Sequence, residues 1–172
     1  MSGFKMKVSE FGPDPARIAG EFKSKRVEAG IFAPEGSTPF MIAMVNEYGV
    51  EIKVTPKMRG YFAWAFGAHL KKTTEKIKIP ARPFIGPGAD RAMDGIEAIV
   101  EKALPKVFMG LLSADDFYGL IGDYAVGQIH EYAEALANPP NSELTIREKG
   151  SSKPLVDTGF MLQTIQWQVV DN

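Results

Sequence analysis

The 172-residue sequence contains no cysteine and only two histidines. The absence of cysteine excludes a disulfide framework and a thiolate nucleophile, and it fits a protein made in a reducing cytoplasm. Neither His69 nor His130 has a neighbouring ligand at the spacing of a zinc site. His130 adjoins Glu131, but a single pair of this kind on an amphipathic helix is typical of a structural or solvated position. We therefore expect no metal site and no cofactor.

Long apolar runs and a strong net charge are also lacking. The longest apolar runs, such as 61–66, are far shorter than the roughly 20 residues of a membrane-spanning helix, and no N-terminal signal pattern is present. A net charge of −1 gives no overall reason to expect nucleic acid or an anionic membrane as a partner. With 45% hydrophobic residues, we expect one soluble intracellular domain spanning residues 1–172.

Signatures of enzymes are scarce. The sequence has no phosphate-binding Gly-x-x-x-x-Gly-Lys-Ser/Thr loop, no Gly-x-Ser-x-Gly elbow and no Gly-x-Gly-x-x-Gly fingerprint. Asp157-Thr158-Gly159 matches the tripeptide of aspartic proteases, whose mechanism requires two aspartates, so a dimer would have to supply the second. In the structural interpretation, the Asp157 carboxylate caps a turn and Gly159 supplies a permissive backbone. We expect no catalytic residue, and a dimeric hydrolase around Asp157 is the alternative.

The N-terminal third predicts short elements. Alternating apolar residues at 4–8, before a turn at 12–15, predict a strand, and 26–33 predicts a second strand that pairs with it as an antiparallel ribbon. Thr38 and Pro39 are placed as the N-cap and first residue of a short helix over 40–48. Gly49 ends this helix as its C-terminal cap.

Residues 50–79 form an excursion flanked by two alternating strands, which predicts a β-hairpin-like arm. Four aromatic residues lie in its middle, bracketed by glycines: Tyr61, Phe62, Trp64 and Phe66. They either cover the core of the same subunit or lie on an arm-like loop that reaches another subunit, because aromatic residues are enriched at interface centres. The cationic residues of the excursion are the exposed face of a ribbon or a contact for nucleic acid, namely Lys57, Arg59, Lys71, Lys72, Lys76 and Lys78.

Two helices follow. Helical periodicity covers about 89–109, where Pro105 should kink or split the helix. A second helix runs from Ser113, which forms a capping-box-like pair with Asp116, to about residue 136. The neighbouring Asp115 and Asp116 favour the positive end of the helix dipole.

The C-terminal part contains a polar loop at 138–160 with a short helical turn near 145–149, followed by a strand over 163–170. Together the elements predict an α+β fold, in which two amphipathic helices pack on one face of a mainly antiparallel sheet.

Three motifs, spaced far apart, occur in a fixed order: Asn46-Glu47-Tyr48-Gly49, Ile79-Pro80-Ala81-Arg82-Pro83-Phe84, and Pro154-Leu155-Val156-Asp157-Thr158-Gly159. From about Phe40 to the C-terminus, the sequence resembles the tail-completion and virion-morphogenesis proteins of tailed bacteriophages. Those proteins carry sequences like Asn-Glu-Phe-Gly, Ile-Pro-Ala-Arg-Pro-Phe and Lys-Pro-Leu-Ile-Asp-Thr-Gly. Tyr48 and Val156 stand here in place of Phe and Ile, and the first 35 residues match only loosely.

The resemblance implies a structural role. Proteins of this kind assemble as rings, most often six-fold, at the neck of the virion, where the tail meets the head connector. The expected partners are further copies of the chain, the tail tube or terminator protein and the connector or adaptor proteins, with nucleic acid passing only through the ring lumen. The expected location is the virion, assembled in the host bacterial cytoplasm. A host-encoded adaptor domain is a further alternative.

Arg82, between two prolines, is either an interface anchor or part of an internal salt bridge that ties the strand end to a helix. Taken together, the positions expected to serve assembly are Asn46, Glu47, Tyr48, Gly49, Tyr61, Phe62, Trp64, Phe66, Arg82, Pro83, Phe84, Asp157, Thr158 and Gly159.

Overall fold

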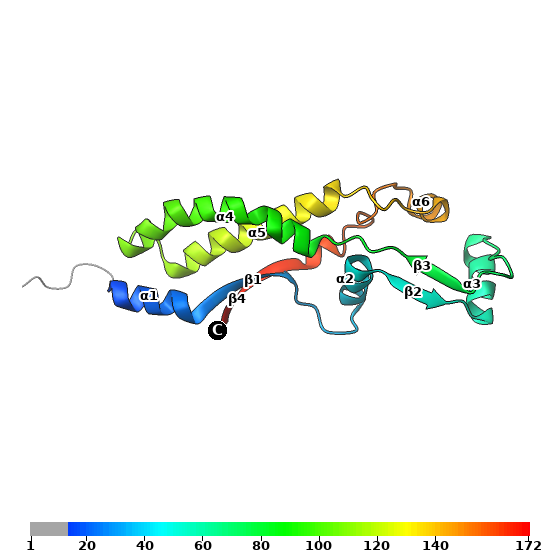
Figure 1. Cartoon of the computed structure of the whole chain (residues 1–172), viewed down its shortest axis with the longest axis horizontal. Coiled ribbons are helices and arrows are strands. Elements are labelled where there is room, and N and C mark those ends of the chain that lie inside the picture. Colours follow the sequence, from blue (N-terminus) through cyan, green and yellow to red (C-terminus); the bar gives the residue numbers. More distant parts are fainter. Residues whose placement is uncertain (1–13) are drawn as a thin grey trace, which may run out of the picture.

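The computed structural model describes residues 14–172, apart from the side chain of Glu21. The molecule is elongated, with a helical body at one end and an arm at the other (Figure 1). In chain order the elements are α1 (Pro15–Ser24), β1 (Lys25–Ile31), α2 (Thr38–Tyr48), β2 (Val50–Lys53), α3 (Pro56–Phe66), β3 (Lys76–Ile79), α4 (Ile85–Phe108), α5 (Ala114–Ala135), α6 (Glu143–Lys149), a 3₁₀ turn (Leu162–Thr164) and β4 (Ile165–Asp171).

The fold mixes helices with small antiparallel sheets, as expected for an α+β chain. The expected single sheet is wrong, because the strands form two separate two-stranded sheets within the described residues, β1–β4 and β2–β3. The strand predicted at 26–33 pairs with the C-terminal strand, from Lys25 opposite Asp171 to Ile31 opposite Ile165. The predicted partner strand at 4–8 lies outside the described residues. The β2–β3 pairing confirms the hairpin predicted for 50–79.

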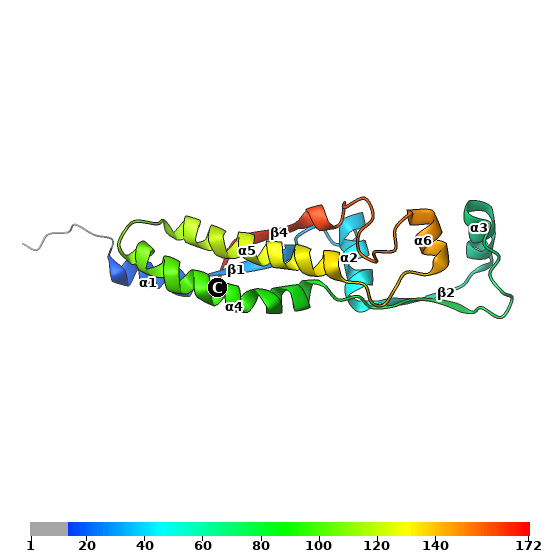
Figure 2. The same cartoon turned by 90° about the horizontal axis from the view of Figure 1, so that it is seen from above.

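Helices α4 and α5 form an antiparallel hairpin, and α5 lies along the β1–β4 ribbon (Figures 1 and 2). Glycines let the backbones approach closely. A Cβ added at Gly88 of α4 would lie 2.7 Å from the Cα of Ile129 on α5. A Cβ at Gly122 would collide with the indole of Trp167, whose Nε1 donates a hydrogen bond to Asp123 Oδ1 at 2.7 Å. Trp167 therefore fits against α5 only because residue 122 has no side chain.

Helix α4 begins earlier than its periodicity predicts. Pro87 lies in its first turn, at a position whose N–H has no intrahelical partner, so the proline costs no hydrogen bond. The Gly88 N–H that follows donates to the Phe84 carbonyl at 3.1 Å. Pro105 does not split the helix, which continues to Phe108. The capping of α5 is confirmed, because Ser113 Oγ accepts a hydrogen bond from the Asp116 N–H at 3.0 Å.

Helices α1 and α3 differ from the sequence-based expectations. Asp14 caps α1 by accepting a hydrogen bond from the Ala16 N–H at 2.9 Å, and Pro15 is its first residue. Thr55 caps α3 by accepting from the Met58 N–H at 3.2 Å, and Pro56 follows it. The aromatic segment, for which the sequence predicted no helix, is therefore helical. Both helices begin with a capping residue followed directly by proline, which is a strong start signal.

The buried side chains form two clusters. One lies at the body end of the molecule and contains Ile18, Ala103, Val107, Phe117 and Tyr118. The other lies where the arm meets the body and contains Ala43, Phe84, Ile129, Ala133, Leu155, Met161, Leu162 and Ile165.

Two glycines of α5 provide a matched test of this packing. Gly122→Ala should lower the free energy of unfolding by about 1–3 kcal/mol, because the added methyl displaces Trp167. Gly127→Ala, which meets no atom within 4 Å, should raise it by about 0.5–1 kcal/mol through helix propensity. Urea denaturation measures both. Equal effects of the two substitutions would contradict the packing of Trp167 on α5.

Candidate functional site

The three sequence motifs meet where the arm joins the helical body. Asn46–Gly49 is the end of α2, Ile79–Phe84 connects β3 to α4, and Pro154–Gly159 lies between α6 and β4. These segments are far apart in the sequence, and the contacts described below hold them together. We call this region the arm junction.

Glu47 caps helix α4 from a different helix. Its Oε2 accepts hydrogen bonds from the N–H groups of Phe84 at 2.8 Å and Ile85 at 3.1 Å, and its Oε1 accepts from Gly86 at 3.3 Å. The N-cap residue of α4 is Phe84, which has no side-chain acceptor. A carboxylate placed there satisfies N–H groups that the helix leaves unpaired, and it interacts favourably with the helix dipole. Glu47 therefore connects the first motif to the second.

Asn46 and Gly49 make a second connection between the same motifs. The Asn46 carbonyl accepts a hydrogen bond from the Arg82 N–H at 2.5 Å. Gly49 ends α2 with a φ of +70°, and a Cβ there would lie 2.7 Å from the Ala81 nitrogen. Both the positive φ and the close approach require glycine. Tyr48 between them is exposed and contributes nothing to this connection.

Arg82 is neither an exposed interface anchor nor part of an ion pair among the described residues. Its side chain is 6% exposed, and its Nε and Nη2 donate to the carbonyl oxygens of Pro139 at 2.7 Å and Pro140 at 2.9 Å. Burial lowers the pKa of Arg82. Proline carbonyls satisfy the guanidinium because a prolyl segment offers acceptors without competing N–H donors. The described residues therefore support neither interpretation of Arg82 from the sequence, while Pro83 beside it is exposed.

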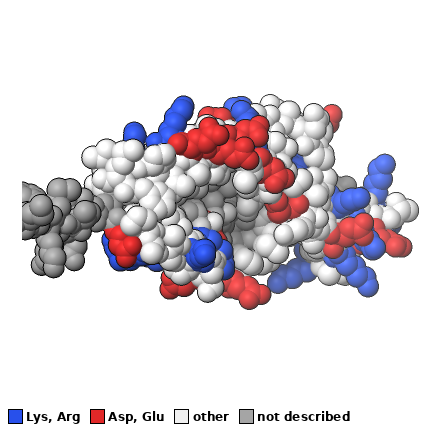
Figure 3. All heavy atoms as spheres, turned by 60° about the vertical axis from the view of Figure 1, so that its left-hand side comes forward, with Lys and Arg blue, Asp and Glu red and all other residues white. Residues whose placement is uncertain are grey.

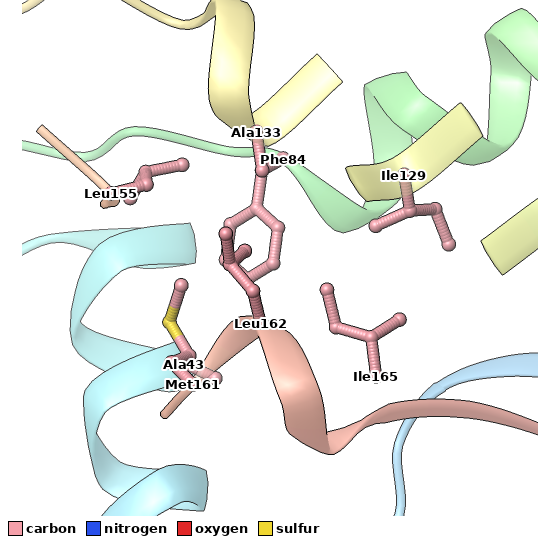
Figure 4. Close-up of a cluster of buried hydrophobic side chains, with 8 residues drawn as sticks. All are labelled: Ala43, Phe84, Ile129, Ala133, Leu155, Met161, Leu162 and Ile165. Atoms are coloured by element: carbon pink, nitrogen blue, oxygen red, sulfur yellow. The ribbon is translucent and has the colours of Figure 1, made fainter. Parts of the chain in front are cut away.

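Phe84 is the hydrophobic centre of the arm junction. It is fully buried, and Figure 4 shows its ring surrounded by side chains from α2, α5 and the segment before β4. Leu155 of the third motif belongs to this cluster, and so do Met161 and Leu162, which follow that motif. The second and third motifs therefore contribute to one packed cluster, and the first motif is joined to it by the hydrogen bonds of Glu47 and Asn46.

The Asp157-Thr158-Gly159 tripeptide forms a turn at the surface. The Thr158 hydroxyl accepts a hydrogen bond from the Phe160 N–H at 3.3 Å, and Gly159 has a φ of +78°. The Asp157 carboxylate makes no hydrogen bond within residues 14–172, so the expectation that it caps the turn is wrong. Its charged neighbour is Lys149, whose pKa is lowered by burial and raised in part by Asp157.

Lys149 also fixes the polar loop of the third motif. Its ammonium donates to the carbonyl oxygens of Lys153 at 2.9 Å and Pro154 at 3.0 Å. Gly150 follows it in the left-handed conformation that ends α6. The loop is thus held by a cation on backbone carbonyls, just as the prolyl segment after α5 is held by Arg82.

The arm ends in a helix with two distinct faces. Phe62 and Phe66 are partly buried, and Tyr61 packs edge-on against both. Tyr61 and Trp64 are 54% and 84% exposed. The aromatic residues therefore divide: two contribute to the inner surface of the arm tip, and two project into solvent.

Arg59 connects α3 to the loop that follows it. Its guanidinium donates hydrogen bonds to four carbonyl oxygens of the loop that follows α3, those of Leu70 at 3.2 Å, Lys71 at 2.8 Å, Lys72 at 3.4 Å and Thr74 at 2.6 Å. Arg59 is therefore a structural residue, and it is not available to the nucleic-acid contact considered for the cationic residues of the arm.

A groove of about 820 Å³ lies beside the arm junction, between α2, β3, α3 and the start of α6. Its lining is largely apolar and includes Ile42, Phe62, Ile77 and Leu144. A hydrogen bond of 2.7 Å from Arg147 Nη2 to the Phe66 carbonyl joins α6 to the arm tip.

In the part of the chain that the structure describes, no three His, Asp or Glu side chains are grouped so that they could hold a metal ion. Among the same residues, no helix combines the length and apolar character needed to cross a membrane. No protein-family model, curated protein or solved structure matches the chain.

Removal of the Glu47 cap should destabilise the arm junction. Glu47→Ala leaves three N–H groups of α4 without their acceptor and should lower the free energy of unfolding by about 2 kcal/mol. The control is Glu51→Ala on β2, which removes an exposed ion pair with Lys76 and should cost less than about 1 kcal/mol. Thermal and urea unfolding followed by circular dichroism would measure both, and equal losses would contradict a capping role.

Arg82→Met should lower the free energy of unfolding by about 2–4 kcal/mol. The methionine keeps much of the side-chain volume but leaves two prolyl carbonyls without donors. The stability of Arg82→Lys should lie between those of the wild type and Arg82→Met, since an ammonium reaches fewer acceptors than a guanidinium. Arg26→Met, at an exposed pair with Glu28, is the control and should change stability by less than about 1 kcal/mol. A stable Arg82→Met variant would show that the junction does not depend on this residue.

Proposed function

We propose that this chain is a structural virion protein of a tailed phage or prophage, a tail-completion or neck component that joins the tail to the head connector through ring assembly. The observation that carries the proposal is the use made of the three motifs. Their side chains hold an arm on a body through a helix cap, a buried guanidinium and a hydrophobic cluster. Residues that hold parts of a subunit together in this way suit a protein that acts through subunit contacts rather than through catalysis.

The shape of the molecule supports the same proposal. An elongated subunit with an arm that presents exposed aromatic residues fits a protein that contacts neighbours at both ends (Figure 1). We infer that the amphipathic helices α4 and α5, packed over the β1–β4 ribbon, form the rigid wall of each subunit, and that the partners are further copies, six in a ring, with the tail tube or terminator protein and the connector or adaptor proteins. The location would then be the virion neck, and DNA would meet the protein only in the ring lumen.

The alternative of a dimeric hydrolase gains no support from the surroundings of Asp157. The charge that interacts with Asp157 is that of Lys149, and the second aspartate that the aspartic mechanism needs would still have to come from another copy. The other alternative, a host-encoded adaptor domain, is not specifically supported by any of the contacts described above. We therefore favour a non-enzymatic role.

Solution mass tests the proposal. Light scattering on a size-exclusion column should give a ring, or a monomer that becomes a ring when the tail tube or connector protein is added. Asp157→Asn should assemble like the wild type, because the carboxylate is exposed and makes no hydrogen bond within the described residues. A monomer that is indifferent to both partners would contradict the proposal, and loss of a hydrolytic activity in Asp157→Asn would favour the enzyme.

A further inference from the structure

The charge of the chain is near zero only because two regions of opposite sign compensate. Residues 50–79, the arm, carry seven lysines and arginines against two glutamates, a net charge of +5. Residues 85–135, which include α4 and α5, carry three basic residues against nine acidic ones, a net charge of −6. In Figure 3 the acidic side chains gather in a band over the upper part of the body, where Figure 1 places these helices. The molecule is therefore basic at one end and acidic over its body.

The acidic residues of α4 form a stripe along the outer face of the helix. Asp90, Asp94, Glu97 and Glu101 follow one another at intervals of four, three and four residues, which places them on one side, and all four are exposed. The buried residues Ala92, Ala103 and Val107 lie on the other side, against α5 and the body core. None of the four carboxylates takes part in an ion pair within the described residues. Met93 lies beside the stripe and is 54% exposed.

The outer face of α3 carries the complementary groups. Lys57, Tyr61 and Trp64 lie at intervals of four and three residues, and all three are exposed. The Tyr61 and Trp64 rings are 6.2 Å apart, so they form one aromatic surface with a cation at its edge. Because Arg59 fixes the loop behind this face, the aromatic surface loses little conformational freedom on binding.

These two faces cannot meet within one molecule, because α3 and the body lie at opposite ends in both Figure 1 and Figure 2. We propose that the outer face of α3 in one copy docks on the acidic stripe of α4 in the next copy. The inference rests on the proposed ring assembly and assigns the surfaces that form it. A contact between two different faces is head-to-tail, and repetition of such a contact closes into a ring or extends into a filament.

The dimensions and chemistry of the two faces agree. The stripe and the α3 face correspond to about 16 Å and about 10 Å of helix at the usual rise per residue. Trp64 and Tyr61 supply the aromatic anchors that dominate interface energies, and Met93 offers an adaptable apolar partner. Lys57 then faces the carboxylates at the edge of the contact, which favours this register over others, because a like-charged face would be repelled.

Charge reversal with complementation tests the contact. The variant Asp94→Lys/Glu97→Lys changes the charge of the stripe from −4 to 0, and Lys57→Glu/Lys71→Glu changes the charge of the arm from +5 to +1. Each alone should raise the protein concentration needed for assembly by about tenfold or more, since most of the attraction between the two faces is then lost. Mixed in equal amounts, the two variants should assemble again, because the unchanged arm of one can dock on the unchanged stripe of the other, while the exchanged charges on the two remaining faces attract each other. A loss of folding stability cannot produce this recovery.

Matched controls separate this contact from general effects of charge. Glu35→Lys/Glu134→Lys changes the net charge equally at exposed positions outside the stripe and should shift the assembly concentration by less than about twofold. Trp64→Ala should weaken assembly by about tenfold without lowering the melting temperature, because its side chain is 84% exposed. Higher salt should weaken assembly of the wild type and leave the Trp64→Ala effect in place.

A crosslink gives a direct readout, since the chain has no cysteine of its own. Trp64→Cys combined with Asp94→Cys should form disulfide-linked multimers on mild oxidation, while Trp64→Cys combined with Glu134→Cys should remain largely monomeric on a non-reducing gel. The yield should fall when the stripe is reversed at Glu97.

The outcomes distinguish this inference from the proposed function. Rings that persist unchanged in both charge-reversal variants would overturn the α3–α4 contact and leave ring assembly standing. A wild type that stays monomeric at all concentrations, alone and with its phage partners, would contradict both. If Lys57→Glu/Lys71→Glu abolishes binding to a short DNA duplex while the oligomeric state is unchanged, the arm serves nucleic acid and the inference is wrong.

Discussion

The capping of α4 by Glu47 is the interaction on which the arrangement of this molecule depends. Helix α4 is the longest helix of the described chain, and its N-cap residue Phe84 has no polar side chain. The carboxylate that completes it comes from α2, 37 residues earlier. Because α2 leads directly into β2 and the arm, the hydrogen bonds that complete the helix also fix the direction in which the arm leaves the body.

Arg82 and Phe84 extend this constraint to the rest of the chain. Arg82 lies just before the cap and reaches the prolyl segment that follows α5, while Phe84 fills the cluster that Leu155 and Met161 enter from the C-terminal side. The arm junction is thus held together by three interactions that lie within a few residues of one another: a polar helix cap, a buried cation and an apolar cluster. Such a junction is stiff, and a stiff junction is what an arm needs if it is to contact a neighbour without a large loss of conformational entropy.

Much of the secondary structure could be predicted from local patterns. The helix ending at Gly49, the hairpin of β2 and β3, the Ser113 cap and the closing strand are confirmed because each depends on neighbouring residues. The pairing of β1 with β4 could not be predicted, since it joins the two ends of the described chain, where the hydrogen bond from Arg26 to Asn172 spans 146 positions. Helix α3 was not predicted because its aromatic residues favour strands, while the Thr55 cap and the proline after it favour a helix start.

The candidate site could be predicted as a set of residues but not as a structure. The motifs include Glu47, Arg82 and Phe84, yet their roles as helix cap, hydrogen-bond donor to prolyl carbonyls and core residue depend on contacts over 37 to 58 positions. The signal that could have indicated the cap is the absence of any polar N-cap before α4, which requires an acceptor from elsewhere. The division of the aromatic residues into two inner and two outer rings follows only from the helical conformation of α3.

Amide hydrogen exchange at Phe84, Ile85 and Gly86 would show whether the three motifs form one cooperative structural junction. The Phe84 and Ile85 amides should exchange as slowly as those in the middle of α4, because the Glu47 carboxylate holds them until the junction unfolds. Exchange as fast as at a frayed helix end, in a protein whose α4 interior is protected, would contradict a cooperative junction.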